Sequence, residues 1–340
     1  MYRILVVADS RDASTHTAVL QPFEHLARHG ILEYNVKSSK SVEPVDVAVH
    51  DVIVVQRSIE PSLLQILVWT RKYNKGLIYD LDDNFFSIED TGQPPGTYYN
   101  RPIVKQIVTR IAAGADLVRA ASRQLAEALT PVARRVVFRR NAIDLGLIDS
   151  FGPRPQGPSP LIIGYSGTPK VSDFQMVLPA LQRLLNERPG ALELDFMGFI
   201  PQELIGHPSI SFVPFEFNYS RYLYNLWSRG WHVGIAPLQD HQFNRCKTDI
   251  KFREYGALGI PGVYSRLPNY EECIQDGISG LLADNHPYSW YPAIRRLLDA
   301  PNLREQVARN ARSWVVQNNS IEKVAAEWRG LLQEFFSFNS

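Results

Sequence analysis

The chain has 340 residues, of which 45% are hydrophobic and 21% are charged, and its formal net charge is +1. This is the composition of a soluble globular protein, and the near-zero charge gives no reason to expect a nucleic-acid partner. A chain of this length more often forms two domains than one. The two cysteines, Cys246 and Cys273, are too few for a disulfide framework, which fits a reducing compartment.

The chain begins with a short apolar run over residues 3–8, which is too short for a signal peptide and typical of a buried strand. No apolar run approaches the ~20 residues that cross a bilayer. We therefore expect a cytoplasmic protein, and peripheral contact with the inner face of the membrane is compatible with this sequence.

Strand and helix signals alternate over the first 150 residues, which predicts an α/β domain with a parallel sheet. Buried strands are expected at 3–8, 51–55, 76–81, 116–121 and 136–138. Helical patterns occupy 17–29, 61–73, 101–114 and 122–129. We expect residues 1–150 to form an N-terminal Rossmann-like domain.

The stretch 151–160 contains four prolines and two glycines, so it favours a linker over a helix or a central strand. A second alternating series follows, with strands at 161–165, 192–197, 210–213, 232–236 and 261–264 and helices at 173–187, 219–228, 248–258 and 269–275. Residues 161–320 are expected to form a C-terminal Rossmann-like domain. The helical segment 321–340 is expected to pack back toward the first domain. Two such domains would face each other across a cleft at the carboxyl edges of their sheets, where ligands bind.

The most informative segment runs from Lys247 to Pro261 and is followed by a second glycine-marked turn at 276–282. Lys247, Lys251 and Glu254 are spaced i, i+4 and i+7, which predicts one helical face with two cations and a carboxylate. This chemistry suits a ligand that presents a diphosphate and a ribose side by side.

The segment resembles the donor-binding signature of GT-B glycosyltransferases of the group 1 (family 4) kind, K-x-x-x-K-x-x-E-Y-x-A-x-G-x-P followed by D-G-x-x-G-x-L. The resemblance covers most of the C-terminal half and, more weakly, the N-terminal half. It implies the GT-B fold and transfer of a sugar from a nucleotide-diphosphate sugar to a saccharide or lipid-linked saccharide. It further implies that the domain 1–150 lies on the acceptor side and that the domain 161–320 binds the nucleotide sugar. It also implies retention of anomeric configuration and a place in bacterial polysaccharide biosynthesis.

The resemblance also implies roles for individual residues. Glu254 occupies the position that accepts hydrogen bonds from the ribose, and Lys247, Thr248 and Lys251 lie where the helix start and nearby cations hold the diphosphate. In the loop after the first strand of the second domain, Lys170 is at the spacing of a second cation, and this loop contains Gly167. Tyr165 stands where relatives often have an arginine.

The chain departs from this pattern at two places. Retaining relatives carry a glutamate eight positions before the ribose glutamate, and Cys246 stands there. The glycine-rich loop after the first strand is replaced by residues 9–14. These departures bear on the sugar and on activity more than on nucleotide binding.

In the N-terminal half, residues 76–86 resemble the strand and D-x-D-D turn of a subset of enzymes that build bacterial polysaccharides. Asp82 and Asp83 follow the strand, at the edge where a catalytic residue belongs, and either would act as a base if the enzyme inverts. Arg57 and the turn 141–144 belong to the same rim by resemblance.

Several alternatives remain open at this stage. Asp80, Asp82 and Asp83 fit a D-x-D metal site, although we expect no cofactor, because cations and a helix dipole are available for the diphosphate. Glu254 fits an ordinary surface pair with Lys251 or Arg253. The aromatic residues between Tyr219 and Trp227 are interpreted as packing. For the whole chain, a nucleotide-sugar epimerase and a non-catalytic sugar- or nucleotide-binding partner subunit are the alternatives to a transferase.

Overall fold

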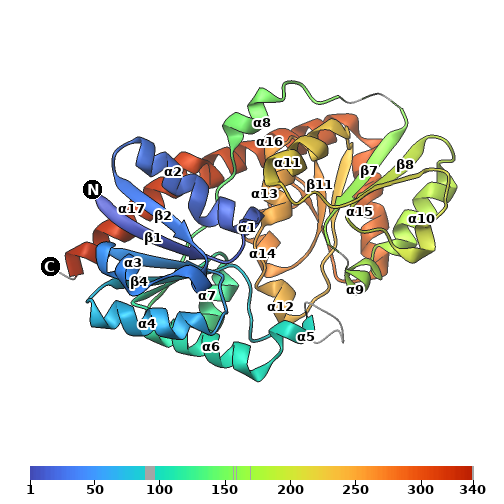
Figure 1. Ribbon diagram of the computed structural model, residues 1–340. Helices are drawn as coiled ribbons and strands as arrows, with labels where there is room; N and C mark the ends of the chain where they lie inside the picture. The colour runs from blue at the N-terminus through green and yellow to red at the C-terminus, as the bar shows by residue number, and fades with distance from the viewer. Residues whose placement is uncertain (89–95, 156, 158, 169, 339–340) are drawn as a thin grey trace. The chain divides into compact units, whose positions relative to one another are not determined.

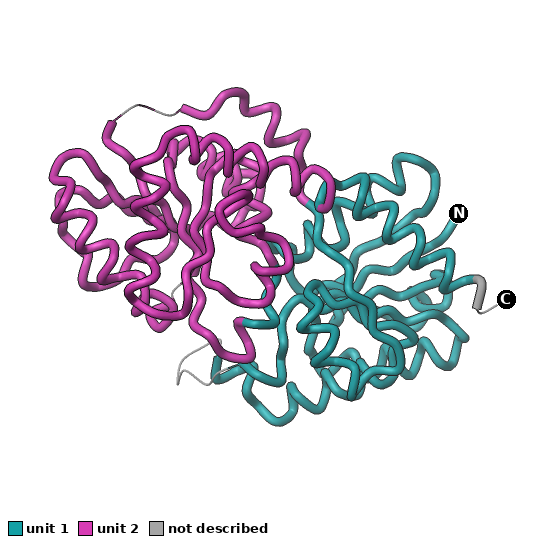
Figure 2. Tube along the Cα trace, turned by 180° about the vertical axis from the view of Figure 1, so that it is seen from behind, with its two compact units in different colours: residues 1–142, 245–248, 319–340 teal, residues 143–244, 249–318 magenta. Residues whose placement is uncertain are grey.

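The computed structural model describes residues 1–88, 96–155, 157, 159–168 and 170–338. These residues form two six-stranded sheets, each made of parallel strand pairs (Figure 1). The chain divides into two compact units (Figure 2). Unit 1 comprises 1–142, 245–248 and 319–340, and unit 2 comprises 143–244 and 249–318.

The sheet of unit 1 has the order β2-β1-β3-β4-β5-β6. Its strands are β1 Tyr2–Ala8, β2 Leu32–Lys37, β3 Val52–Gln56, β4 Gly76–Leu81, β5 Leu117–Ala120 and β6 Val136–Phe138. Its helices are α1 Ala13–Thr15, α2 Gln21–Arg28, α3 Pro44–Val49, α4 Ser62–Lys72, α5 Gly96–Tyr99, α6 Pro102–Gly114, α7 Arg123–Leu129 and α17 Ile321–Phe338. The strands β3 and β4 are buried at every residue, as expected for a sheet covered on both faces.

Alternate residues of β1 supply the two faces of this sheet. Leu5 and Val7 join the core under α4 and α6, whereas Ile4 and Val6 join the core under α2 and α17. The C-terminal helix α17 is held there by Trp328, whose indole nitrogen donates to the carbonyl of Ala18 at 2.8 Å. The last helix of the chain therefore completes the core of unit 1.

The sheet of unit 2 has the order β12-β11-β10-β7-β8-β9. Its strands are β7 Leu161–Ser166, β8 Leu192–Met197, β9 Ile210–Val213, β10 Val233–Ala236, β11 Gly262–Ser265 and β12 Leu281–Ala283. Its helices are α8 Leu145–Ser150, α9 Val171–Phe174, α10 Leu178–Glu187, α11 Tyr219–Ser228, α13 Ile250–Ala257, α14 Pro268–Glu271, α15 Pro287–Asp299 and α16 Pro301–Asn319. The short helix α12, Gln242–Arg245, reaches the boundary between the units.

The strands predicted in both halves are confirmed to within two residues at each end, and three helix predictions are corrected. Strands β2 and β12 and helix α3 were not predicted, because their apolar signals are short or weak. The helix expected at 173–187 is two helices, and the one expected at 269–275 ends at Glu271. The helix expected at 248–258 begins only at Ile250.

The first segment of unit 1 ends at Ala142, whereas the predicted domain ran to residue 150. Helix α8 belongs to unit 2 because Asp149 pairs with Arg312 and because Phe151 packs against Tyr224 at 5.5 Å. Within the predicted linker, Gln156 and Pro158 lie outside the described residues. In the described part of the chain, no helix has both the length and the apolar character of a membrane span.

Candidate functional site

Polar residues gather at the carboxyl edge of the sheet of unit 1. The parallel register pairs Ala8 with Gln56 and Gln56 with Asp80, so the loops after β1, β3 and β4 begin side by side. These loops carry Asp12, Arg57, Asp82 and Asp83, in the position where open α/β sheets bind ligands.

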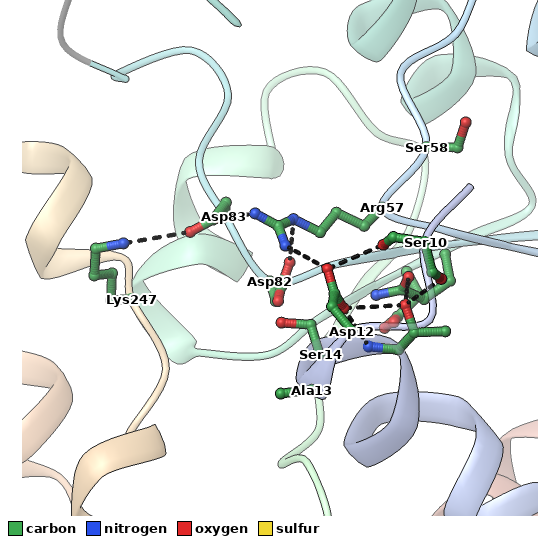
Figure 3. A network of polar contacts seen from close by, with 12 residues as sticks. Ser10, Asp12, Ala13, Ser14, Arg57, Ser58, Asp82, Asp83 and Lys247 are labelled. Carbon is green, nitrogen blue, oxygen red and sulfur yellow. Dashed lines mark hydrogen bonds and ion pairs between the residues drawn. The ribbon is translucent and has the colours of Figure 1, made fainter. Parts of the chain in front are cut away.

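Arg57 is the centre of this group (Figure 3). Its Nη2 lies 2.6 Å from Oδ2 of Asp83, its Nε lies 3.2 Å from Oδ1 of Asp82, and its Nη1 lies 3.4 Å from Oδ2 of Asp12. Its backbone has a φ of 52°, which is uncommon for a residue with a side chain and is a conformation that clusters at functional sites. Lys247 adds a second cation, with its Nζ 3.6 Å from Oδ1 of Asp83.

Asp82 is the buried acid of this group, with 7% of its surface exposed. Burial raises the pKa of Asp82 to about 6, with the attraction of Arg57 opposing the rise and the charge of Asp83 adding to it. The same pairing raises the pKa of Arg57, chiefly through Asp82. Asp82 therefore exchanges its proton in the range where general acids and bases operate.

A cavity of about 230 Å³ lies beside this group in unit 1. Asp9, Asp12, Arg57, Glu60 and Tyr98 are among its lining residues. Its polar lining and small volume suit a ligand the size of one sugar ring better than a drug-sized apolar molecule.

Asp80 is a structural residue and not part of the rim. It is fully buried, and its Oδ1 lies 2.5 Å from Nη1 of Arg119. Arg119 also donates to the side chain of Asn141 at 2.9 Å, which holds the turn at 141–144 against β5. Among the described residues, no group of three or more histidine, cysteine or acidic side chains is placed to hold a metal ion.

The segment Arg245–Thr248 belongs to unit 1, although the chain before and after it belongs to unit 2. Cys246 is fully buried in the core of unit 1, its carbonyl accepts a hydrogen bond from Oγ of Ser122 at 2.6 Å, and its sulfur accepts one from Asn84 at 3.4 Å. Lys247 and the half-buried Thr248 therefore precede helix α13 and do not lie on it. The prediction that Lys247 shares a helical face with Lys251 and Glu254 is wrong.

A second buried polar group lies in unit 2, where β7, α11 and α13 meet. Glu254, with 1% of its surface exposed, accepts hydrogen bonds at Oε2 from Tyr222 at 2.8 Å and from Lys251 at 2.9 Å. Lys251 also donates to the Tyr222 hydroxyl at 2.6 Å, as does Ser166 at 2.9 Å. Glu254 does pair with Lys251, as an ordinary surface ion pair would, but its carboxylate is buried and does not lie on a helix surface.

Helix α13 is buried because small residues allow close packing around it. All six residues from Phe252 to Ala257 are buried. A side chain at Gly256 would meet a methyl group of Val315 at 2.9 Å and the carbonyl of Ala311 at 3.2 Å, so glycine is needed where α13 packs on α16. Packing thus explains Tyr255, Gly256 and Ala257 of the motif. Hydrogen bonds to polar partners explain Lys251 and Glu254.

The other predicted residues of unit 2 lie in and after β7. Lys170 pairs with Asp173 at 3.6 Å. Tyr165 is 4% exposed and packs edge-on against Phe174 at 4.6 Å, so it belongs to the core and does not replace an exposed arginine. The backbone of Gly167 donates to the carbonyl of Met197 at 3.0 Å, and a Cβ at Gly167 would meet the Tyr165 hydroxyl at 2.5 Å. Pro169, in the same loop, lies outside the described residues.

The structure thus brings Lys251 together with Glu254. It brings Asp82 and Asp83 together on Arg57, with Lys247 beside Asp83. Sequence reasoning missed the central position of Arg57 and the roles of Tyr222 and Asp12. Tyr222 was hidden in an aromatic cluster that looked like packing, and no local pattern links it to Glu254.

The chain was compared with known proteins, and no protein-family model matches it. A curated relative, a D-inositol 3-phosphate glycosyltransferase from Acidothermus cellulolyticus, is 36% identical over 106 residues, which is 30% of this chain and 22% of the relative. Sucrose-phosphate synthase from Thermosynechococcus elongatus superimposes with a TM-score of 0.71 at 14% identity, over 99% of this chain and 100% of that one. HepE from Anabaena, solved with UDP and glucose, superimposes with a TM-score of 0.69 at 12% identity, over 98% of this chain and 99% of that one.

These full-length superpositions and the two parallel sheets define the chain as a GT-B protein with two Rossmann-like units. The predicted fold class is confirmed. Assignment to group 1, family 4 stays a prediction.

Proposed function

We propose that the chain is a glycosyltransferase that moves a sugar from a nucleotide-diphosphate sugar to a saccharide or lipid-linked saccharide. The observation that carries this proposal is the buried group of Glu254, Lys251 and Tyr222 at the start of α13, in the segment whose sequence resembles a donor-binding motif. The name of the curated relative, a glycosyltransferase, supports the same reaction class, and the UDP and glucose bound to HepE are compatible with it.

Transfer breaks the bond between the anomeric carbon and the diphosphate, so negative charge grows on the leaving group. An enzyme lowers this barrier with cations and N–H dipoles that are already in place. Lys251 and the N-terminus of α13 would stabilise the diphosphate, and Glu254 would accept hydrogen bonds from the ribose. We expect Lys170 to act as a second cation.

In unit 1, Asp82 and Asp83 are proposed to act on the acceptor side. With retention, the diphosphate itself assists removal of the acceptor proton, and these carboxylates only position the acceptor. With inversion, Asp82 is the better base, because its raised pKa makes it the stronger proton acceptor. Two results together would support the base role. The transfer rate of the unmodified protein should fall below about pH 6, and the rate of Asp82→Asn should not show this fall.

The test is a thermal-shift screen with UDP-glucose and with other UDP-, GDP-, ADP- and dTDP-sugars, since a ligand that binds only the native state raises the melting temperature. The donor that binds is then incubated with saccharide acceptors, and labelled product is measured. Label in an acceptor supports a transferase. Binding without turnover on any acceptor points to a non-catalytic partner subunit, and an epimeric donor formed without acceptor points to an epimerase.

Contact with a membrane is proposed only through a lipid-linked acceptor. Flotation with vesicles that contain a polyprenyl-phosphate glycan, compared with vesicles that lack it, tests this contact. Equal recovery with both vesicles would contradict it.

A further inference from the structure

The hydroxyl of Tyr222 joins three side chains from β7 and α13. It lies 2.8 Å from Oε2 of Glu254, 2.6 Å from Nζ of Lys251 and 2.9 Å from Oγ of Ser166. A phenol offers one hydrogen and two lone pairs, an ammonium only donates, and a carboxylate only accepts. Tyr222 therefore donates to Glu254 and accepts from Lys251 and Ser166, which uses all of its bonding capacity.

The direction of these bonds is fixed because the phenol keeps its proton. Burial, followed by the negative charge of Glu254, raises the pKa of Tyr222 well above its ordinary value. The ring is also held in place, since it stacks on Tyr219 at 6.0 Å with an interplanar angle of 14°. Nζ of Lys251 lies 2.6 Å from the hydroxyl and 5.1 Å from the ring centre, so it meets Tyr222 at the hydroxyl end of the ring.

Both charged partners keep bonding capacity that these contacts do not use. The hydrogen bonds from Tyr222 and Lys251 both end on Oε2 of Glu254, so neither of them uses Oε1. Tyr219 is a second buried phenol that interacts with this carboxylate. Among the described residues, Lys251 donates to Tyr222 and Glu254, which uses two of its three ammonium hydrogens, and the third can meet a further acceptor. A ribose hydroxyl is a donor that Oε1 can accept, and a phosphate oxygen is such an acceptor.

We propose that Tyr222 is the positioning residue of the nucleotide site, which holds Glu254 and Lys251 so that one carboxylate oxygen meets the ribose and one ammonium hydrogen meets the diphosphate. This inference rests on the proposed function. Tyr222 would thereby give the site its preference for ribonucleotides over deoxyribonucleotides. The 2′-hydroxyl can form a good hydrogen bond only with a carboxylate that is held in the right orientation.

The test uses the ribo- and 2′-deoxy forms of UDP, GDP and ADP, and calorimetry with the base that binds best. In the unmodified protein, we expect the 2′-deoxy form to bind roughly ten- to a hundred-fold more weakly, the range for a hydrogen bond to a charged group. Tyr222→Phe keeps the ring and removes the hydroxyl. We expect this variant to bind the ribo form less than about threefold more tightly than the 2′-deoxy form, mostly because its affinity for the ribonucleotide falls.

Two variants separate positioning from a general loss of stability. Tyr255→Phe is the matched control, because Tyr255 is also fully buried on α13, but its hydroxyl donates to the carbonyl of Ile235 at 3.2 Å. We expect this control to prefer the ribo form over the 2′-deoxy form as strongly as the unmodified protein does. Ser166→Ala removes one hydrogen bond of the Tyr222 hydroxyl without touching Glu254 or Lys251, and we expect a partial decrease of this preference.

The outcomes distinguish this inference from the proposed function. If the unmodified protein binds no nucleotide, both the inference and the proposed function fail. If it binds the ribo and 2′-deoxy forms equally well, the positioning role of Tyr222 fails and the transferase proposal stands. If it distinguishes them and folded Tyr222→Phe distinguishes them equally well, only the positioning role is overturned. If Tyr222→Phe does not fold, Ser166→Ala decides, and an unchanged preference for the ribo form in that variant counts against the inference.

Discussion

Arg57 combines an unusual backbone conformation with an unusual set of partners. A left-handed φ at a residue with a side chain costs of order 1–3 kcal/mol and persists only where the surroundings impose it. Here three carboxylates and the bond from its backbone nitrogen to the carbonyl of Asp80 at 2.9 Å hold the residue. The arginine thereby keeps Asp82 and Asp83 together at the rim, where two acids alone would repel each other.

Asp82 should make the stability of the protein depend on pH. Its pKa is about 6 in the folded protein, whereas an unfolded aspartate titrates near its ordinary value of 3.8. Between these values the folded state holds the extra proton, so the contribution of this group to stability is present at low pH and is lost as pH rises to 6. Across this window, we expect the contribution to change by about 2–3 kcal/mol.

The measurement is denaturant unfolding of the unmodified protein and of Asp82→Asn at several pH values between 4 and 7. The difference between the two free energies of unfolding should favour the unmodified protein progressively as the pH falls. Two parallel curves would show that Asp82 titrates like an exposed acid. Acids far from Asp82 contribute equally to both proteins and cancel in the difference.

Lys251 is the cation that we expect to matter most for turnover. Lys251→Ala should lower kcat by roughly 10²–10³-fold and change the donor KM less, because it removes one preorganised stabiliser of charge in the transition state. Lys251→Arg should restore activity only in part, since the larger planar guanidinium of arginine does not replace a compact ammonium. Lys247→Ala should be milder, because Lys247 lies with Asp83 in unit 1. A larger loss in Lys247→Ala than in Lys251→Ala would reverse these roles.

At the scale of elements, the segment Arg245–Thr248 decides where α13 begins. Cys246 stands where the resemblance places a glutamate on the donor sugar, but it is buried in the core of unit 1. Introducing a carboxylate should therefore not add a donor contact. We expect Cys246→Asp to destabilise the protein by about 3 kcal/mol or more, since an unpaired charge would be buried.

Cys246→Ala is the matched control for this change, with an expected loss on the order of 1 kcal/mol from the smaller apolar side chain. Denaturant midpoints with unchanged slopes report both values. An Asp variant as stable as the Ala variant, or one with tighter donor binding, would contradict the buried position of this side chain.

The elements also show what local patterns can and cannot predict. The buried runs of β1, β3 and β4 are long and apolar, so their type and position follow from the sequence. The start of α13 does not, because the spacing of Lys247, Lys251 and Glu254 fits a longer helix equally well. Only the tertiary burial of Cys246 removes Lys247 from that helix. For the same reason, Tyr222 becomes visible as a partner of Glu254 only when α11 and α13 are packed together.

At the scale of the whole molecule, the chain passes between its units at 142/143, 244/245, 248/249 and 318/319. Unit 1 is therefore not a contiguous stretch of sequence. A fragment of residues 1–150 would lack α17 and expose the core face that Val324, Trp328 and Leu332 cover. This explains why a boundary drawn from the proline-rich stretch alone does not isolate the first unit.

Removal of metal ions tests how the whole protein would neutralise a diphosphate. We expect EDTA to leave donor binding and transfer largely intact, because Lys251 and the N-terminus of α13 supply the positive charge. The measurement is turnover before and after chelation, with Mg²⁺ or Mn²⁺ added back. Loss on chelation that either ion restores would place a metal in the reaction and overturn this mechanism.

The central claim is that Glu254 binds the ribose of a nucleotide, and calorimetric titration tests it most directly. UDP, GDP and ADP are titrated into the unmodified protein and into Glu254→Ala, with Glu254→Gln as the variant that keeps the side-chain shape. We predict that one of these nucleotides binds the unmodified protein and that its affinity falls by about 1.5–3 kcal/mol in the folded Ala variant. Unchanged affinity in that variant, or no binding of any nucleotide to the unmodified protein, would contradict the claim.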